Sequence, residues 1–172
     1  MNKQITNILI GGPMGSGKST LAKSLSKYLN IKITDIDEIC EPESSTRELI
    51  WNVFEKVYRY NNENKISSIY VATFSFRETR DKFLEIGDKY KNNTFPFFIS
   101  CSIETCANNI NKRDYLEDHH INGTNAAEKL EKWFKNFESQ NNEDLGAKWV
   151  TIENQDFKDN HKLINSIVEL VG

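Results

Sequence analysis

The chain is short of the residues and segments that mark several classes of protein. Its 172 residues include three cysteines, three prolines and eight glycines. The cysteines form no C-x-x-C pair, which argues against a disulfide framework and for reduced thiols. Its apolar runs fall short of a membrane span, and residues 1–12 lack the pattern of a signal peptide. We therefore expect a cytoplasmic protein with no membrane partner.

The chain also lacks a large excess of positive or negative charge. The net charge is −3 and the pI is about 5.7, so no overall positive field attracts nucleic acid, and a nucleic-acid substrate is not expected. Hydrophobic residues make up 38% of the chain, enough for one domain with a sizeable core over residues 1–172. A monomer and a homodimer are both compatible with this composition.

Apolar strand-like runs alternate with helix-like segments along the chain. The expected strands are Thr6–Gly11, Ile31–Thr34, Ser68–Phe74, Thr94–Ser100 and Trp149–Ile152. The expected helices are Lys18–Asn30, Ser45–Asn61 with Ser45 as its cap, Glu78–Tyr90, Ile103–Lys112, Ala126–Ser139 and Asp159–Val171. This order predicts an α/β fold, a three-layer α/β/α sandwich around a five-stranded parallel sheet. Ligands are expected at the carboxyl ends of the strands.

A glycine-rich stretch, GGPMGSGKST, occupies Gly11 to Thr20. From Gly12 it reads G-x-x-x-x-G-K-S, the P-loop pattern, between an expected strand and an expected helix. Glycines let backbone N–H groups approach a phosphate, and the helix start favours an anion. The loop is therefore predicted to bind ATP with Mg²⁺. The predicted nucleotide-binding residues here are Gly12, Pro13, Met14, Gly15, Ser16, Gly17, Lys18, Ser19 and Thr20.

An acidic pair follows the second expected strand. Asp35 and Asp37 are two residues apart, so in an extended segment both side chains point the same way. One carboxylate can hold Mg²⁺ through water, and the other can accept the proton of a hydroxyl that attacks the γ-phosphate. The alternative is a pair of turn residues, because aspartate is common in turns.

The stretch GGPMGSGKSTLAKSLSKYLNIKITDIDEI resembles the opening of shikimate kinases. That family has a GPMG-x-GK-[ST] loop followed, after a helix and a strand, by D-x-D and an apolar residue. The likeness implies the P-loop kinase fold of small-molecule and nucleotide kinases. It also implies that Asp35 assists Mg²⁺ and that Asp37 contacts the acceptor hydroxyl, with the choice of base between them open.

The likeness ends where shikimate would be held. Shikimate kinases carry F-R-x-x-E in the next helix, whereas this chain has STRELIWNVFEKV, with Arg47 as its single arginine. They also have a run of glycines after the third strand, where this chain has VATFSFRETRDKF. Shikimate is therefore not predicted as the acceptor.

Two arginines follow the third expected strand. Arg77 and Arg80 stand at i and i+3, on one face of a helix start. Guanidinium groups suit a carboxylate, sulfate or phosphate on an acceptor, so both arginines are predicted to bind the substrate. The segment resembles adenylylsulfate kinases and gluconate-kinase-like proteins, in which R-x-x-R follows such a strand. The alternative is surface ion pairs with Glu78 and Asp81.

The resemblance to these kinases extends to a lid and a base pocket. Their helix after the fourth strand carries arginines that reach the phosphates or stack on adenine, and Arg113 stands at this place. The polar stretch 113–125 is expected to form a small mobile lid, with His119 and His120 exposed to solvent. After the last strand, TIENQDF occupies the place where these kinases wrap adenine, which puts Asn154 near the base.

The predicted activity is transfer of the γ-phosphate of ATP to a hydroxyl of a small-molecule acceptor, as in shikimate, gluconate or adenylylsulfate kinases. The predicted catalytic residues are Lys18, Asp35, Asp37 and Arg113, and the predicted metal ligands are Ser19 and Asp35. Two alternatives stay open: a nucleoside, nucleotide or polynucleotide 5′-hydroxyl kinase, and a regulatory ATPase or GTPase. NKRD at Asn111–Asp114 matches the guanine-reading motif of GTPases, but it ends an expected helix instead of following a buried strand.

Overall fold

Strands and helices alternate along the part of the chain that the computed structural model describes, residues 5–39, 46–114, 128, 130–137, 148–154 and 160–171. The strands are β1 (Thr6–Gly11), β2 (Lys32–Asp35), β3 (Ser68–Val71), β4 (Asn93–Ser100) and β5 (Val150–Glu153). The helices are α1 (Lys18–Leu29), α2 (Ile36–Ile39), α3 (Arg47–Glu63), α4 (Arg77–Lys89), α5 (Ile103–Asp114) and α7 (Asn160–Val171). Residues 130–137 are also helical.

The five strands form one sheet in the order β2-β3-β1-β4-β5, and every neighbouring pair is parallel. β1 lies in the middle, where Ile8 is opposite Ile69 of β3 and Phe95 of β4. Because all strands run the same way, their carboxyl ends meet at one edge of the sheet, and the loop after β1 lies at the centre of that edge. The predicted five-stranded parallel sheet is confirmed.

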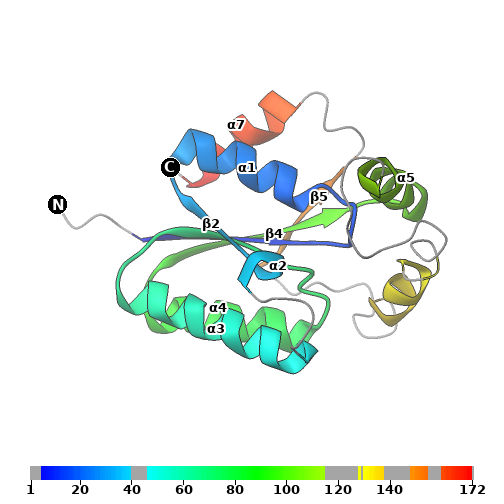
Figure 1. Cartoon of the computed structure of the whole chain (residues 1–172). Coiled ribbons are helices and arrows are strands. Elements are labelled where there is room, and N and C mark those ends of the chain that lie inside the picture. Colours follow the sequence, from blue (N-terminus) through cyan, green and yellow to red (C-terminus); the bar gives the residue numbers. More distant parts are fainter. Residues whose placement is uncertain are drawn as a thin grey trace.

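Helices cover both faces of the sheet, which gives the three layers seen in Figure 1. Side chains alternate along β1, so Ile8 and Ile10 belong to one apolar cluster and Leu9 to the other. The first cluster includes Leu21 and Leu25 of α1 and Ile164 and Ile167 of α7. The second includes Phe54 and Tyr58 of α3 and Phe83 and Leu84 of α4. The near-continuous apolar strands of the sequence are thus explained by burial on both sides.

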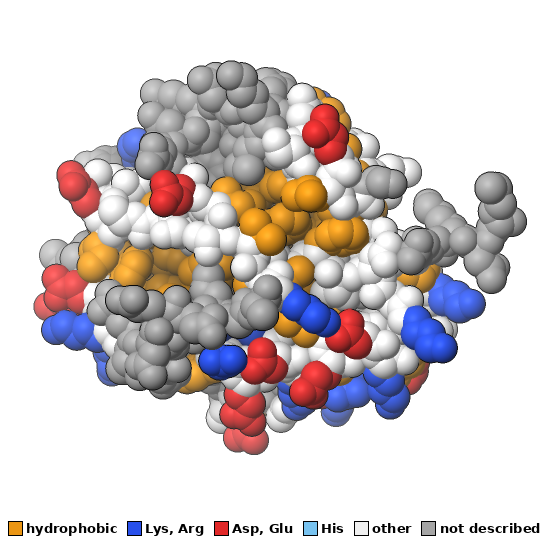
Figure 2. Space-filling model, turned by 180° about the vertical axis from the view of Figure 1, so that it is seen from behind, with side chains coloured by type: hydrophobic (Ala, Val, Ile, Leu, Met, Phe, Trp, Pro, Cys, Tyr) orange, Lys and Arg blue, Asp and Glu red, His pale blue; other side chains and the backbone are white. Residues whose placement is uncertain are grey.

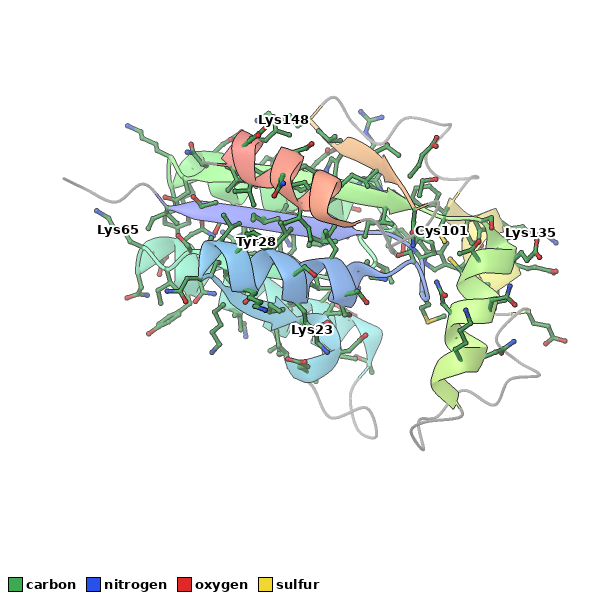
Figure 3. All side chains as sticks on the ribbon, turned by 90° about the horizontal axis from the view of Figure 1, so that it is seen from above. Lys23, Tyr28, Lys65, Cys101, Lys135 and Lys148 are labelled. Atoms are coloured by element: carbon green, nitrogen blue, oxygen red, sulfur yellow. The ribbon has the colours of Figure 1, made fainter. Side chains whose placement is uncertain are left out.

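A third, smaller cluster lies at the carboxyl edge of the sheet. It joins Cys101, at the end of β4, to Cys106 and Ile110 of α5 and to Leu130 of the 130–137 helix. In Figure 3 the labelled Cys101 and Lys135 lie at this end of the molecule, beside α5. The cluster fixes α5 and the 130–137 helix next to the loop that follows β1.

Several element boundaries differ from the predicted ones. The third strand ends at Val71 instead of Phe74, because Phe74 has a left-handed φ of 44° that no strand accommodates. The cap of α3 is Thr46, whose side chain accepts a hydrogen bond from the Leu49 N–H, and the predicted cap Ser45 lies outside the described residues. The ends of the predicted helix 126–139 also lie outside them.

The surface carries mixed charge on the face seen in Figure 2. Apolar side chains gather in the middle of that face, while Lys, Arg, Asp and Glu intermingle below them. Among the described residues, no helix is both long and apolar enough to cross a bilayer.

Candidate active site

The loop between β1 and α1 has the backbone of a phosphate-binding P-loop. Gly12, Gly15 and Gly17 have φ angles of 138°, 77° and 91°, in the left-handed range that side chains avoid. The loop is anchored at its start by a 3.2 Å hydrogen bond from the Gly12 N–H to the Thr73 carbonyl at the end of β3. α1 begins directly after the loop, at Lys18. The predicted sequence of strand, loop and helix is confirmed.

Close packing also requires a glycine at two of these positions. A Cβ on Gly12 would lie 2.6 Å from the Ile99 carbonyl oxygen of β4. A Cβ on Gly15 would overlap with the backbone of Cys106 in α5, 3.0 Å from its Cα and nearer still to its carbonyl oxygen. The loop is therefore enclosed by β4 and α5, and its shape depends on both.

Lys18 and Ser19 open α1 and face the acidic pair. The Lys18 ammonium donates a 2.7 Å hydrogen bond to the Pro13 carbonyl, so it folds back over the loop. The Ser19 hydroxyl donates a 3.3 Å hydrogen bond to Oδ2 of Asp35. A hydroxyl beside a carboxylate is a pair of hard oxygen donors, which fits a magnesium ion. Thr20, the last predicted loop residue, is exposed.

Asp35 and Asp37 lie together, but not in the extended segment that we predicted. Asp35 ends β2 and is buried, whereas Asp37 lies in the short helix α2 and is exposed. The side chain of Asp35 accepts a 3.1 Å hydrogen bond from the Asp37 N–H, so the first carboxylate caps the turn that carries the second. The pair is thus brought together by a local turn, because the chain bends immediately after β2.

The pKa of Asp37 is raised above its usual value. Partial desolvation by the surrounding protein raises it most, and the nearby negative charge of Asp35 raises it further, while the positive charge of Lys18 lowers it. A carboxylate with a raised pKa is suited to accept a proton.

Arg77 and Arg80 stand three residues apart in α4 but differ in burial, so the predicted substrate-binding role does not fit Arg80. Arg77 lies exposed at the start of α4, with its Nε 3.6 Å from a carboxylate oxygen of Asp81. Arg80 is fully buried, and its guanidinium donates hydrogen bonds of 2.8 Å and 3.1 Å to the carbonyls of Phe74 and Ser75. Since Arg80 is turned into the protein, it holds the β3–α4 turn and is not available to an acceptor in solvent.

The 130–137 helix braces the same turn, and no pattern in the sequence predicts this contact. The Trp133 indole donates a 2.9 Å hydrogen bond to the Ser75 hydroxyl. The Trp133 ring stacks on Phe137 with centroids 5.0 Å apart, and the Arg80 guanidinium lies 5.8 Å from the Phe137 ring centroid. The left-handed Phe74 and the buried arginine are therefore fixed from two sides.

Two asparagines contact the P-loop itself. Asn154, which we expected near the base, donates a 2.7 Å hydrogen bond from its side-chain amide to the Ser16 carbonyl. Asn109 of α5 donates a 2.8 Å hydrogen bond to the Gly15 carbonyl. No feature of the sequence singles out Asn109, because 94 residues separate it from its partner.

The predicted lid falls mainly outside the described residues. Residues 115–125, with His119 and His120, are not among them, and neither is the side chain of Arg113. The backbone of Arg113 belongs to the last turn of α5. The NKRD motif therefore ends a helix and does not follow a strand, so it lacks the context of a guanine-binding site.

The fold and the loop define the class of protein. An all-parallel, five-stranded sheet between helices, with a P-loop after its central strand, is the fold of P-loop kinases. Residues 8–138 match the family described as AAA domain, and the chain belongs to that family.

Individual relatives agree with this assignment. The shikimate kinase of Legionella pneumophila (strain Corby) is 40% identical over 48 residues, which are 28% of this chain and 27% of that protein. The match thus spans less than a third of this curated relative. Among solved structures, a gluconokinase from Sinorhizobium meliloti 1021 has a TM-score of 0.69 at 14% identity, over 99% of this chain and 95% of that one. A shikimate kinase from Acinetobacter baumannii has a TM-score of 0.63 at 18% identity, over 97% and 93%. At identities this low, the TM-scores show that the fold is shared, and the fold alone.

Proposed function

We propose that this protein transfers the γ-phosphate of ATP to a hydroxyl group of a small-molecule acceptor. The observation that carries the proposal is the contact of the P-loop with the acidic pair at one edge of the sheet, where Ser19, next to Lys18, donates to Asp35 and Asp35 caps the turn that carries Asp37. Phosphoryl transfer relies mainly on positioning and on stabilisation of charge, and this arrangement offers both. The fold shared with a gluconokinase and a shikimate kinase supports the same class of reaction.

The loop from Gly12 to Thr20 binds the phosphates in this proposal. Backbone N–H groups and the start of α1 attract the anion, and Lys18 exchanges the Pro13 carbonyl for the β- and γ-phosphates. Ser19 and Asp35 hold Mg²⁺, which when bound neutralises charge on the phosphates. Arg113, in the last turn of α5, adds positive charge from the lid side.

Asp37 orients the acceptor hydroxyl and takes its proton. As the acceptor oxygen bonds to the γ-phosphorus, the bond to the β-phosphate oxygen breaks, the hydroxyl proton passes to the Asp37 carboxylate, and ADP leaves. The raised pKa of Asp37 favours this role. Asp35 is assigned to the metal instead, because its oxygens already accept hydrogen bonds from Ser19 and from the Asp37 N–H.

An anionic group on the acceptor would meet Arg77. Its guanidinium is exposed at the start of α4, paired with the equally exposed Asp81, and such a surface pair is weak enough to be exchanged for a ligand. Arg80 lies buried behind this position and supports the turn. The proposed acceptor is therefore a hydroxylated anion of the sugar-acid or adenylylsulfate kind.

The experiment is to measure ADP release from Mg·ATP with pooled acceptors. The pools are sugar acids with shikimate, adenylylsulfate, nucleosides, nucleotides, and an oligonucleotide with a 5′-hydroxyl. We expect the first or second pool to raise the rate well above the rate without acceptor. Stimulation by the nucleoside, nucleotide or oligonucleotide pool would move the acceptor to that class, and background rates in every pool would contradict the transferase.

Two lysine variants test the mechanism. Lys18→Ala should abolish turnover, because the phosphates lose their main cation. Lys23→Ala is the matched control, since Lys23 is exposed on the same helix, one turn further along (Figure 3). Normal turnover in Lys18→Ala would refute the mechanism.

A further inference from the structure

Two side-chain amides from distant parts of the chain hold neighbouring carbonyls of the P-loop. Asn109 of α5 donates to the Gly15 carbonyl at 2.8 Å, and Asn154, directly after β5, donates to the Ser16 carbonyl at 2.7 Å. The two carbonyls belong to consecutive peptide units at the tip of the loop. Both asparagines are half-buried, so water competes less for these hydrogen bonds than at the surface.

A hydrogen bond that holds a backbone carbonyl also fixes the direction of the N–H on the same peptide unit. The peptide bond is planar and trans, so its C=O and N–H point in opposite directions. Because Asn154 holds the Ser16 carbonyl, the Gly17 N–H is held in the opposite direction, and the P-loop mechanism requires such fixed N–H groups to donate to a phosphate. When Asn109 holds the Gly15 carbonyl, it fixes the Ser16 N–H, which donates to the Pro13 carbonyl at 3.2 Å and closes the turn.

α5 backs the loop with a rigid surface next to Asn109. The backbone of Cys106 lies against Gly15, and Cys106 and Asn109 are three residues apart, on one side of the helix. Cys106 is itself fully buried in the cluster that joins α5 to the 130–137 helix. The loop and α5 are therefore in direct backbone contact, so a displacement of one would displace the other.

We propose that Asn109 and Asn154 are positioning residues that hold the P-loop ready for a phosphate, and that Asn109 couples phosphate binding to α5. The inference rests on the proposed function only in that the loop binds the phosphates of a nucleotide. Neither side chain needs to touch the ligand. The proposal would explain why asparagines are found at these places, since each supplies one short donor that reaches a backbone carbonyl.

Binding of ADP, measured by calorimetry, tests the positioning role. Asn109→Leu and Asn154→Leu keep the size of the side chain and remove the donor, and each should weaken ADP roughly three- to tenfold, the worth of one hydrogen bond. Asn108→Leu is the matched control, because Asn108 is the exposed neighbour on the same helix and should bind ADP as the wild type does. If a leucine variant fails to fold, Asn109→Asp or Asn154→Asp replaces it, since a carboxylate of the same shape repels the carbonyl.

Hydrogen exchange distinguishes positioning from a general loss of stability. In the wild type, saturating ADP should slow amide exchange both in the P-loop and in residues 103–114 of α5. In Asn109→Leu, saturating ADP should still protect the P-loop but should no longer protect α5. Equal protection of α5 in both proteins would overturn the coupling, and unchanged ADP affinity in both leucine variants would overturn the positioning role.

The outcomes separate this inference from the proposed function. If the wild type binds ADP and Lys18→Ala does not, while the asparagine variants bind normally, the positioning role is wrong and the nucleotide site stands. If the wild type binds no ADP, both proposals are wrong. If ADP binding follows the expected pattern but no acceptor is phosphorylated, the positioning role stands without the transferase.

Discussion

Gly15 lies against the backbone of α5, so Gly15→Ala perturbs the P-loop and the helix at once. Alanine in the left-handed conformation costs about 1–2 kcal/mol, and Gly15 has a φ of 77°. The new Cβ would also overlap with the backbone of Cys106. The Cys106 atoms in this overlap belong to the backbone, so no rotation of a side chain relieves it. The loop or the helix must therefore move by on the order of 0.5–1 Å.

The expected losses of stability and of ADP affinity follow from the strained conformation and this displacement. A free energy of unfolding lowered by about 2 kcal/mol corresponds to a melting temperature roughly 4–8 °C lower for a chain of this length. A misplacement approaching 1 Å in a site that depends on position can reduce activity about a hundredfold. We also expect Gly15→Ala to bind ADP roughly ten- to a hundredfold more weakly, measured by calorimetry, because a displaced loop N–H loses a hydrogen bond to a charged phosphate worth about 1.5–3 kcal/mol. The variant should melt earlier by differential scanning fluorimetry.

Gly87→Ala is the control for a loss of stability that leaves the P-loop unchanged. A Cβ on Gly87 would overlap with the Thr94 hydroxyl near the start of β4, at the amino end of the sheet. This variant should melt earlier while its folded form binds ADP as the wild type does. If Gly15→Ala instead binds ADP like the wild type and melts at the same temperature, the enclosure of the loop by α5 is wrong.

Three further variants test the surroundings of the loop. Asp37→Asn should lower turnover while ADP affinity stays within about twofold, because the proposed mechanism assigns the carboxylate to the acceptor; a collapse of ADP affinity would assign Asp37 to the nucleotide. The raised Asp37 pKa means that ionisation disfavours folding once the pH rises through it. Asp37→Asn should therefore raise the melting temperature near neutral pH, and by less as the pH falls toward the ordinary aspartate pKa of about 4. Arg80→Leu removes the donor shared by two carbonyls and should lower the free energy of unfolding in urea by about 2–4 kcal/mol. Trp133→Phe keeps an aromatic ring but loses the Ser75 hydrogen bond, and should cost about 1 kcal/mol in the same assay; no change in either variant would contradict the bracing of the β3–α4 turn.

The sequence alone determined the fold and the phosphate site, because both depend on local patterns. The apolar runs near Ile8 and Ile69 predict buried parallel strands, and the alternation with helices leaves one sheet with two covered faces. The P-loop was predictable from its glycines, which are required by backbone conformations within a few residues of one another.

Tertiary structure decided which polar side chains serve the site and which serve the core. Arg77 and Arg80 look equivalent in the sequence, yet one is exposed and the other is buried, because the Arg80 guanidinium packs onto the Phe74 and Ser75 carbonyls and the Phe137 ring. The contacts of Asn109 and Asn154 with the loop span 94 and 138 residues. Such contacts follow from how α5 and β5 pack at the edge of the sheet, and no local pattern in the chain records that packing.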